Sequence, residues 1–362
     1  MVASETLLQA LQAVIDPNTG RPVADAKSVK NLQIDGADVA FDVELGYPAK
    51  SQVSALRSAL IAAAKSVPGV GNVSVNLRTA IAAHAAQRGV ALLPNIKNVI
   101  AVASGKGGVG KSTTAVNLAL ALAAEGARVG ILDADIYGPS QSMMMGINAR
   151  PQSEDGSTME PLENYGVQVM SIGFLVDADE AMIWRGPMAV QALEQLLRQT
   201  NWKDLDYLVV DMPPGTGDIH LSLSQKVPVT GAVIVTTPQD IALLDARKGV
   251  KMFEKVGVPI LGVVENMAVH VCSQCGHTEH IFGEGGGQKM AADYGLAYLG
   301  ALPLDINIRL QADGGQPSVI ADPDGEVAQL YKSVARQVAV AVADMPKDHS
   351  AKLSAISISR AS

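Results

Sequence analysis

The chain has 362 residues, of which 48% are hydrophobic and 18% are charged, and its formal net charge at pH 7 is −8. This length favours two domains, and the composition, rich in Gly and poor in Phe and Trp, is typical of a soluble α/β protein. The acidic balance without Lys and Arg clusters argues against a nucleic-acid partner. The lack of a signal-peptide pattern or an apolar run of about 18 residues argues against membrane association, so we expect a cytoplasmic protein.

Residues 1–83 predict a small α/β domain, because two segments have the apolar spacing of helices and two alternate as strands. The helical segments are ETLLQALQAVI (5–15) and SQVSALRSALIAAAK (51–65), and the strand segments are ADVAFDVELG (37–46) and VGNVSVNLRTAI (70–81). Residues 84–97, which include Pro94, are assigned to a linker.

Residues 98–345 have a different pattern, in which short apolar runs alternate with helical stretches such as TTAVNLALALAAE and AVQALEQLLRQ. The apolar runs are VIAVAS, RVGILDAD, YLVVDMPP, AVIVTTP and PILGVVENM. Runs of this kind are buried on both faces of a sheet, so the segment predicts a doubly wound, mainly parallel sheet. A last helix is expected at about 324–343, followed by a flexible tail at 346–362.

A phosphate-binding loop connects the first apolar run to the helix after it. GKGGVGKS, Gly105–Ser112, fits the P-loop pattern in the strand-to-helix context that the motif requires, which predicts a P-loop NTPase. Glycines let backbone N–H groups surround phosphate oxygens, Lys111 neutralises the β and γ phosphates, and Ser112 ligates Mg²⁺. The predicted nucleotide-binding residues of this loop are Gly105, Lys106, Gly107, Gly108, Val109, Gly110, Lys111, Ser112 and Thr113.

Lys106 is an additional lysine at the second position of the loop. In the usual P-loop shape its side chain points away from the phosphates that its own loop surrounds, so a second subunit would receive it. A cation supplied in this way resembles an arginine finger, whose effect on rate is about 10³ to 10⁵. This interpretation predicts a catalytic role in a dimer, and the alternative is a solvated surface lysine.

Acidic residues end two of the apolar runs, where a parallel sheet binds its ligand. Asp211 is the expected Mg²⁺ partner, and Asp135 is the candidate that orients or deprotonates the attacking water. Asp133 is a candidate for either role, and the alternative for each aspartate is a helix cap or a loop position. Asn266, at the end of ILGVVENM, is predicted to hydrogen-bond the adenine edge, with capping as its alternative.

Cys272 and Cys275 are the two cysteines of the chain and lie in VCSQCG. Two thiolates are half of a four-thiolate site for zinc or for an iron–sulfur cluster. His270, His277 and His280 complete a zinc site within one chain in one interpretation. In the other, a second subunit supplies the matching pair across a two-fold axis. A redox role is disfavoured, since a redox pair requires a helix N-terminus.

Seven motifs together resemble the Mrp/ApbC-type iron–sulfur cluster carriers, which are deviant P-loop ATPases related to MinD, ParA and the nitrogenase iron protein. The motifs are GKGGVGKST, LDADIYGPS, WRGPM, DMPPGTGD, VENM, CSQCGH and IFGEGGG, and the resemblance covers about residues 95–340. It implies that Lys106 acts across a dimer, that Asp135 positions water and that Asn266 contacts adenine. It also implies that Cys272 and Cys275 bind the cluster.

Residues 1–83 resemble the small module that occurs alone in iron–sulfur assembly factors. Such modules commonly carry a cysteine after the second strand, whereas this chain has YPAKSQ at 47–52. A docking role is therefore implied for this domain, and a metal role is not.

The expected protein is a homodimeric, Mg²⁺-dependent ATPase that binds a 4Fe-4S cluster between subunits, receives it from cluster donors and transfers it to apo iron–sulfur proteins. One alternative is a zinc-clamped dimeric ATPase, and another is a MinD/ParA-like positioning ATPase. We also expect Trp184 and Arg185 of WRGPM at an interface, with core and surface positions as the alternative.

Overall fold

A computed structural model describes residues 2–84, 93–176 and 186–347, and these residues form two compact units. The first unit comprises residues 2–82 with Ala124–Gly126, and the second comprises the remaining described residues. Trp184, Arg185, most of the predicted tail and much of the predicted linker lie outside the described residues.

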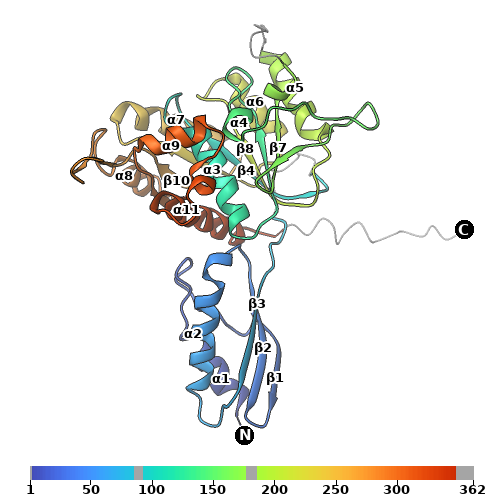
Figure 1. Cartoon of the computed structure of the whole chain (residues 1–362), viewed down its shortest axis with the longest axis vertical. Helices are drawn as coiled ribbons and strands as arrows, with labels where there is room; N and C mark the ends of the chain where they lie inside the picture. Colours follow the sequence, from blue (N-terminus) through green and yellow to red (C-terminus); the bar gives the residue numbers. More distant parts are fainter. Residues whose placement is uncertain (1, 85–92, 177–185, 348–362) are drawn as a thin grey trace, which may run out of the picture. The chain divides into compact units, whose positions relative to one another are not determined.

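The first unit pairs a small sheet with two helices, α1 and α2 (Figure 1). Its elements are α1 (Ser4–Leu11), β1 (Val29–Asp35), β2 (Asp38–Leu45), a 3₁₀ turn (Lys50–Gln52), α2 (Val53–Lys65) and β3 (Val73–Thr79). Burial alternates along β2, where Phe41 and Val43 are buried, so one face of the sheet is covered. Leu56 and Leu60 are buried one helical turn apart on α2, and this apolar stripe closes the core.

The sequence did not predict β1, one of the two edge strands of this sheet. β1 pairs antiparallel with β2, and β3 pairs parallel with β2 on the other side. The register of β1 shifts between Lys30 and Gln33, and Asn31 between them has a φ of 51°. A bulged strand that is mostly exposed has no clear alternation to read.

The second unit is built on a sheet with the order β13-β10-β9-β4-β8-β5-β7-β6 in the described part of the chain (Figure 1). Its strands are β4 (Ile96–Ala103), β5 (Val129–Asp133), β6 (Leu162–Asn164), β7 (Val167–Ser171), β8 (Leu205–Asp211), β9 (Gly231–Thr236), β10 (Ile260–Glu265) and β13 (Tyr298–Ala301). Only β6 pairs antiparallel with its neighbour among these described strands. The predicted doubly wound, mainly parallel sheet is confirmed.

Helices cover this sheet on both faces, since every residue of β5, β8 and β9 is buried. The helices are α3 (Lys111–Ala124), α4 (Gln141–Met144), α5 (Gly186–Gln199), α6 (Asp218–Lys226), α7 (Asp240–Lys255), α8 (Gly286–Asp293), α9 (Ile306–Asp313), α10 (Ser318–Ala321) and α11 (Glu326–Ala343). A short hairpin of β11 (His270–Val271) and β12 (Thr278–Glu279) follows β10. No helix in the described residues has the length and apolar character needed to cross a membrane.

Strand order brings the chemistry-bearing residues together. β8 lies between β4 and β5, and all three are parallel, so their carboxyl ends meet at one edge of the sheet. The P-loop follows β4, Asp133 ends β5 and Asp211 ends β8. This is the edge at which open α/β sheets bind ligands.

Candidate functional site

The P-loop is shaped by glycines at positions where a side chain is excluded. Gly108 and Gly110 have φ values of +81° and +79°, a conformation that L residues adopt at a cost. A Cβ on Gly105 would lie 2.1 Å from the backbone carbon of Asp245 in α7, and one on Gly110 would lie 2.1 Å from Nδ2 of Asn266. The loop is thus packed against α7 and Asn266, and this packing fixes the directions of its backbone N–H groups.

Lys111 lies among carboxylates at the start of α3. Its Nζ donates to Asp211 Oδ1, lies 3.1 Å from Ser112 Oγ and lies 4.0 Å from Asp135 Oδ2. Lys111 is only 6% exposed, and Asp211 is fully buried. Because a buried charge is tolerated only when paired, this ammonium group and these carboxylates compensate one another.

Asp133 holds the loop between β5 and α4. Its carboxylate accepts hydrogen bonds from the backbone N–H groups of Asp135, Ser140 and Gln141 at 3.0 to 3.2 Å and from Ser171 Oγ at 3.0 Å. Burial raises the pKa of Asp133 to about 7, and the negative charge of Asp211 adds to this rise. These contacts make Asp133 a loop-anchoring residue.

Asp135 remains the candidate for orienting water. Its side chain is 12% exposed, whereas Asp133 is fully buried. Burial raises the pKa of the Asp135 carboxyl, while the charge of Lys111 opposes the rise. A carboxylate with a raised pKa is a better proton acceptor, provided that it can reach the attacking water.

Gln141 is a part of the site that the sequence analysis missed. Its side chain contacts both Asp211 and Ser112, the two residues predicted to hold Mg²⁺. No motif marks a glutamine at this position, and the contact with Asp211 spans 70 residues of sequence. The fold alone brings them together.

Asn266 lies between the P-loop and a pocket of about 450 Å³. Its Nδ2 donates to the carbonyl oxygen of Val109 at 2.9 Å, and its side chain is 7% exposed. The pocket is lined mainly by apolar side chains with a few polar ones, a lining that suits a flat heterocyclic base. Its lining includes Met144, Pro303, Leu304, Ile308, Asp305 and Arg309.

Lys106 differs from Lys111 in its surroundings. Its side chain is half-buried, and within the described residues no carboxylate pairs with it. Its carbonyl oxygen accepts a hydrogen bond from Ser104 Oγ at 2.9 Å, which fixes the backbone there. The backbone of Lys106 is held, and its ammonium group lacks a carboxylate partner in the described part of its own chain.

Cys272 and Cys275 lie in the turn between β11 and β12. The Cys272 N–H donates to the carbonyl oxygen of His277 at 2.9 Å, and Gly276, with a φ of +71°, donates to the carbonyl oxygen of Cys272 at 2.8 Å. Cys275 is exposed and Cys272 is partly exposed. The backbone N–H groups of Gln274 and Cys275 lower the pKa of the Cys272 thiol, which favours the thiolate form that binds metals.

The neighbouring histidines contact backbone carbonyls. His270 Nδ1 lies 2.9 Å from the carbonyl oxygen of Leu304, and His280 Nδ1 lies 2.9 Å from that of Ala268. In residues 2–84, 93–176 and 186–347, no three His, Cys, Asp or Glu side chains are placed to hold a metal ion together. A zinc site completed by histidines of the same chain therefore has no support from this geometry.

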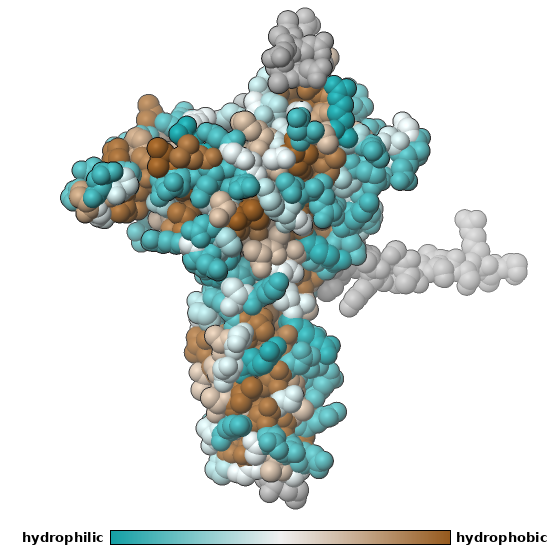
Figure 2. All heavy atoms as spheres, viewed as in Figure 1, coloured by the Kyte–Doolittle hydropathy of each residue, from teal (hydrophilic) through white to brown (hydrophobic). Residues whose placement is uncertain are grey.

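Exposed apolar side chains surround the nucleotide edge and the cysteine hairpin. α7 exposes Ile241 and Leu244, at 65% and 55%, and α9 exposes Ile306 and Leu310, at 62% and 51%. Figure 2 shows brown groups gathered on the larger unit around these two helices. Val271 next to the cysteines is 53% exposed. Apolar groups in this number on one region are typical of an interaction surface.

Comparison with known proteins gives the family. Residues 95–339 match a protein-family model described as the NUBPL iron-transfer P-loop NTPase. The chain belongs to this family. Residues 4–75 also match a model described as an iron–sulfur cluster assembly protein. The family resemblance drawn from the sequence motifs is confirmed.

Two relatives match most of this chain. A Pseudomonas fragi protein named iron-sulfur cluster carrier protein is 62% identical over 275 residues, covering 75% of this chain and 96% of that protein. A Haemophilus influenzae protein of the same name is 48% identical over 331 residues, covering 91% and 90%. The chain is thus a P-loop NTPase of a family of iron–sulfur cluster carriers.

Solved structures agree with this fold. A nucleotide-binding protein from Archaeoglobus fulgidus in complex with ADP is 35% identical, with a TM-score of 0.55, and the match covers 64% of this chain and 90% of that one. The cell division ATPase MinD from Pyrococcus furiosus is 22% identical, with a TM-score of 0.52, over 67% and 98%. The second likeness supports the fold alone.

Proposed function

We propose that this protein is a homodimeric, Mg²⁺-dependent ATPase that holds a 4Fe-4S cluster between its two subunits and transfers it to apo iron–sulfur proteins. The observation that carries the proposal is the position of Cys272 and Cys275, a pair of solvent-accessible thiols at the tip of a hairpin. Such a cluster is cargo, and cargo requires ligands that a recipient can reach.

Two chains are needed because the sequence contains two cysteines and a cluster of this type takes four thiolates. A two-fold axis repeats every contact, so a hairpin at the axis supplies matching pairs from both sides. The exposed apolar residues of α7 and α9, together with Val271, offer a surface for the second copy. Release of the cluster then exchanges these four thiolates for ligands of the recipient as the two copies separate or shift.

The nucleotide site contains the groups that phosphoryl transfer needs. Ser112 and Asp211 supply a hydroxyl and a carboxylate, the hard oxygen ligands that Mg²⁺ prefers, at the edge where the P-loop ends. The ion neutralises charge on the phosphates when bound. Lys111 leaves Asp211 for the phosphates, Asp135 orients the attacking water, and Lys106 of the second copy stabilises the charge that develops on the γ phosphate.

Anaerobic reconstitution of the purified chain with iron and sulfide tests the carrier role. We expect about four iron and four sulfide per dimer, and the loss of both in Cys272→Ala. A matched control is His277→Ala, which changes the same hairpin at an exposed side chain and keeps both thiols. Zinc at one per dimer without iron supports a zinc clamp instead, and cluster content unchanged in Cys272→Ala overturns the site.

A transfer assay tests the second half of the proposal. The loaded dimer is mixed with an apo 4Fe-4S enzyme, and the recovered activity of that enzyme is followed with and without ATP. We expect recovery from the loaded protein and none from Cys272→Ala. A loaded protein that keeps its cluster under every nucleotide condition contradicts the carrier role.

A further inference from the structure

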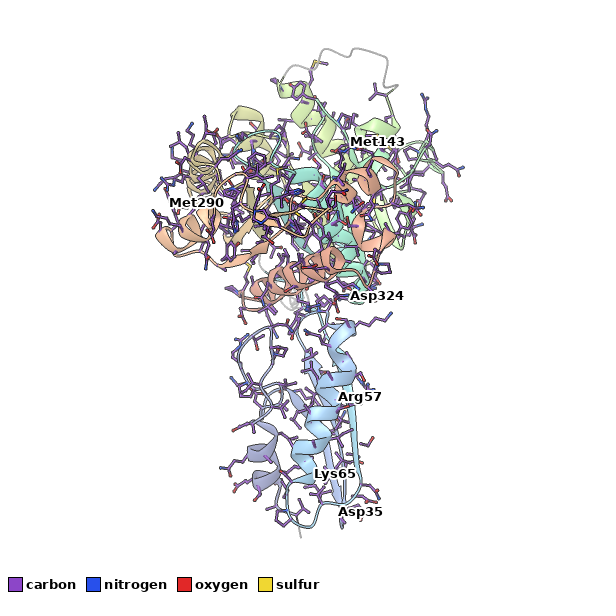
Figure 3. All side chains as sticks on the ribbon, turned by 60° about the vertical axis from the view of Figure 1, so that its left-hand side comes forward. Asp35, Arg57, Lys65, Met143, Met290 and Asp324 are labelled. Atoms are coloured by element: carbon purple, nitrogen blue, oxygen red, sulfur yellow. The ribbon has the colours of Figure 1, made fainter. Side chains whose placement is uncertain are left out.

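Gln141, the first residue of α4, joins three parts of the nucleotide site. Its backbone N–H donates to Asp133 Oδ2 at 3.0 Å, so the carboxylate that ends β5 fixes its position. Its Nε2 donates to Asp211 Oδ2 at 2.8 Å and to the carbonyl oxygen of Ser112 at 3.1 Å. The side chain is fully buried, although α4 reaches the surface at Met143, labelled in Figure 3, which is 58% exposed.

The hydrogen bonds determine the orientation of the Gln141 amide. Both partners of Nε2 are acceptors, so the reversed amide would place oxygen against oxygen at Asp211 and at Ser112. Oε1 is therefore the atom on the other side, and it is buried without a hydrogen-bond partner in the described part of the chain. Buried polar atoms are nearly always paired, so Oε1 takes a donor other than the described protein groups.

Asp211 is held through both of its oxygens. Lys111 donates to Oδ1, and Gln141 donates to Oδ2. When Lys111 moves to the phosphates, Oδ1 becomes available, and Gln141 remains as the contact that keeps the carboxylate in its orientation. Mg²⁺ usually retains several waters in proteins and is bound through few carboxylates, so the orientation of one carboxylate matters.

We propose that Gln141 is a positioning residue for Mg²⁺, which holds Asp211 in the orientation that would receive the hydrated ion. This inference rests on the proposed Mg²⁺-dependent ATPase and deepens it. Groups that orient metal ligands in this way change metal affinity about 10- to 100-fold when they are removed.

The test compares Gln141→Met with the parent in the full chain. Methionine keeps the length of the side chain and removes both hydrogen-bonding ends. Binding of a fluorescent ADP analogue is titrated against Mg²⁺ and is also measured in EDTA. We expect the Mg²⁺ concentration for half-maximal effect to rise at least about tenfold. Affinity in EDTA should fall by less than affinity in Mg²⁺, because the base pocket and the P-loop are intact.

Gln168→Met is the matched control. Gln168 lies on β7 and bonds the backbone of Lys203, away from the P-loop, so its Mg²⁺ dependence should equal that of the parent. Equal weakening of Gln141→Met with and without Mg²⁺ reveals a role in pocket shape only and overturns the proposal. An unchanged Mg²⁺ dependence in a folded Gln141→Met overturns it as well.

Two further measurements keep the inference testable. Should circular dichroism show that Gln141→Met is unfolded, Gln141→Asn, whose amide is too short to reach both partners, is titrated in the same way with the same expectation. In a double-mutant cycle with Asp211→Asn, the two changes should not add, since Gln141 acts through that carboxylate. The readout of this test is binding. If the protein binds Mg²⁺ and ADP but does not hydrolyse ATP, the proposed ATPase function is wrong and this inference still holds.

Discussion

His220 gives the second unit a pH dependence that can be worked out from its surroundings. It lies in α6, directly after the turn that follows Asp211, and is 2% exposed. Neither ring nitrogen has a hydrogen-bond partner in the described residues, and the ring packs edge-on against Phe253 at 5.5 Å. Burial lowers the pKa of His220 to about 4, and the charge of Lys111 adds to this shift, while the backbone of Gly215 opposes it.

The direction of the effect follows from which state binds the proton. The ordinary pKa of histidine is 6.5, so His220 of the unfolded chain is protonated below that pH. His220 of the folded protein stays neutral down to about pH 4. The free energy of unfolding therefore falls as pH drops through this window. The linkage relation gives a loss of about 2 kcal/mol at pH 5 and roughly 3 kcal/mol at full extent.

Substitution isolates this contribution from other titrating groups. Asp133, with its pKa raised to about 7, acts in the opposite direction, because its burial makes unfolding easier as pH rises from about 4 to 7. His220→Phe keeps a ring against Phe253 and removes the titration. We compare the free energy of unfolding of His220→Phe with that of the parent at each pH. This difference should favour His220→Phe by about 2 kcal/mol more at pH 5 than at pH 7.

Urea unfolding followed by tryptophan fluorescence measures this difference. Positions 184 and 202, the two tryptophans, both belong to the second unit's part of the sequence, so the signal reports that unit. His277→Phe is the control, since it makes the same change at a side chain that is 66% exposed. Equal stability changes from pH 7 to pH 5 in the parent and His220→Phe would refute the reasoning.

Three further predictions concern the P-loop. Gly105→Ala should lower the free energy of unfolding by about 1–3 kcal/mol or more, because the added methyl group meets the backbone of α7. Gly107→Ala is the control in the same urea titration and should be nearly neutral, because no atom lies within 4 Å of its added Cβ. Asn266→Ala should cost about 1 kcal/mol of stability through the lost contact with Val109 and should weaken ADP binding in calorimetry; unchanged binding would remove Asn266 from the base site. Lys106→Ala should slow ATP hydrolysis about 10³-fold with ADP affinity retained, and normal turnover in this variant or in an obligate monomer would contradict action in trans.

The sequence predicted those strands that contain a continuous apolar run. β4, β5, β8, β9 and β10 are buried on both faces, and such runs are visible without any knowledge of their neighbours. Strands β1, β6, β7 and β13, at or next to a sheet edge, were missed because their pattern depends on what covers them, whereas the edge strand β3 was predicted from its alternation. β6 and β7 form a hairpin whose two-residue turn, Tyr165 and Gly166, has positive φ at both positions, and a tyrosine there is not a turn signal.

The residues of the candidate site also include some that the sequence could assign and some that it could not. The P-loop is contiguous in sequence, so its glycines and lysines could be assigned from spacing. The anchoring role of Asp133 and the contacts of Gln141 arise only when β5, α4 and β8 are brought together, and no local pattern encodes them. The sequence made Asp133 a candidate for Mg²⁺ binding or for water activation, and the structure adds hydrogen bonds to the loop that it anchors.

In the proposed ATPase, the place of Lys111 beside Asp211 would make the uptake of nucleotide and metal cooperative. A nucleotide that arrives alone would draw the ammonium group onto its phosphates and leave Asp211 buried with no counter-charge. A divalent cation that arrives with the nucleotide would replace the departing lysine, so each ligand would raise the affinity for the other by the same factor. Such a protein would discriminate against free nucleotide in favour of its magnesium complex before any bond is broken.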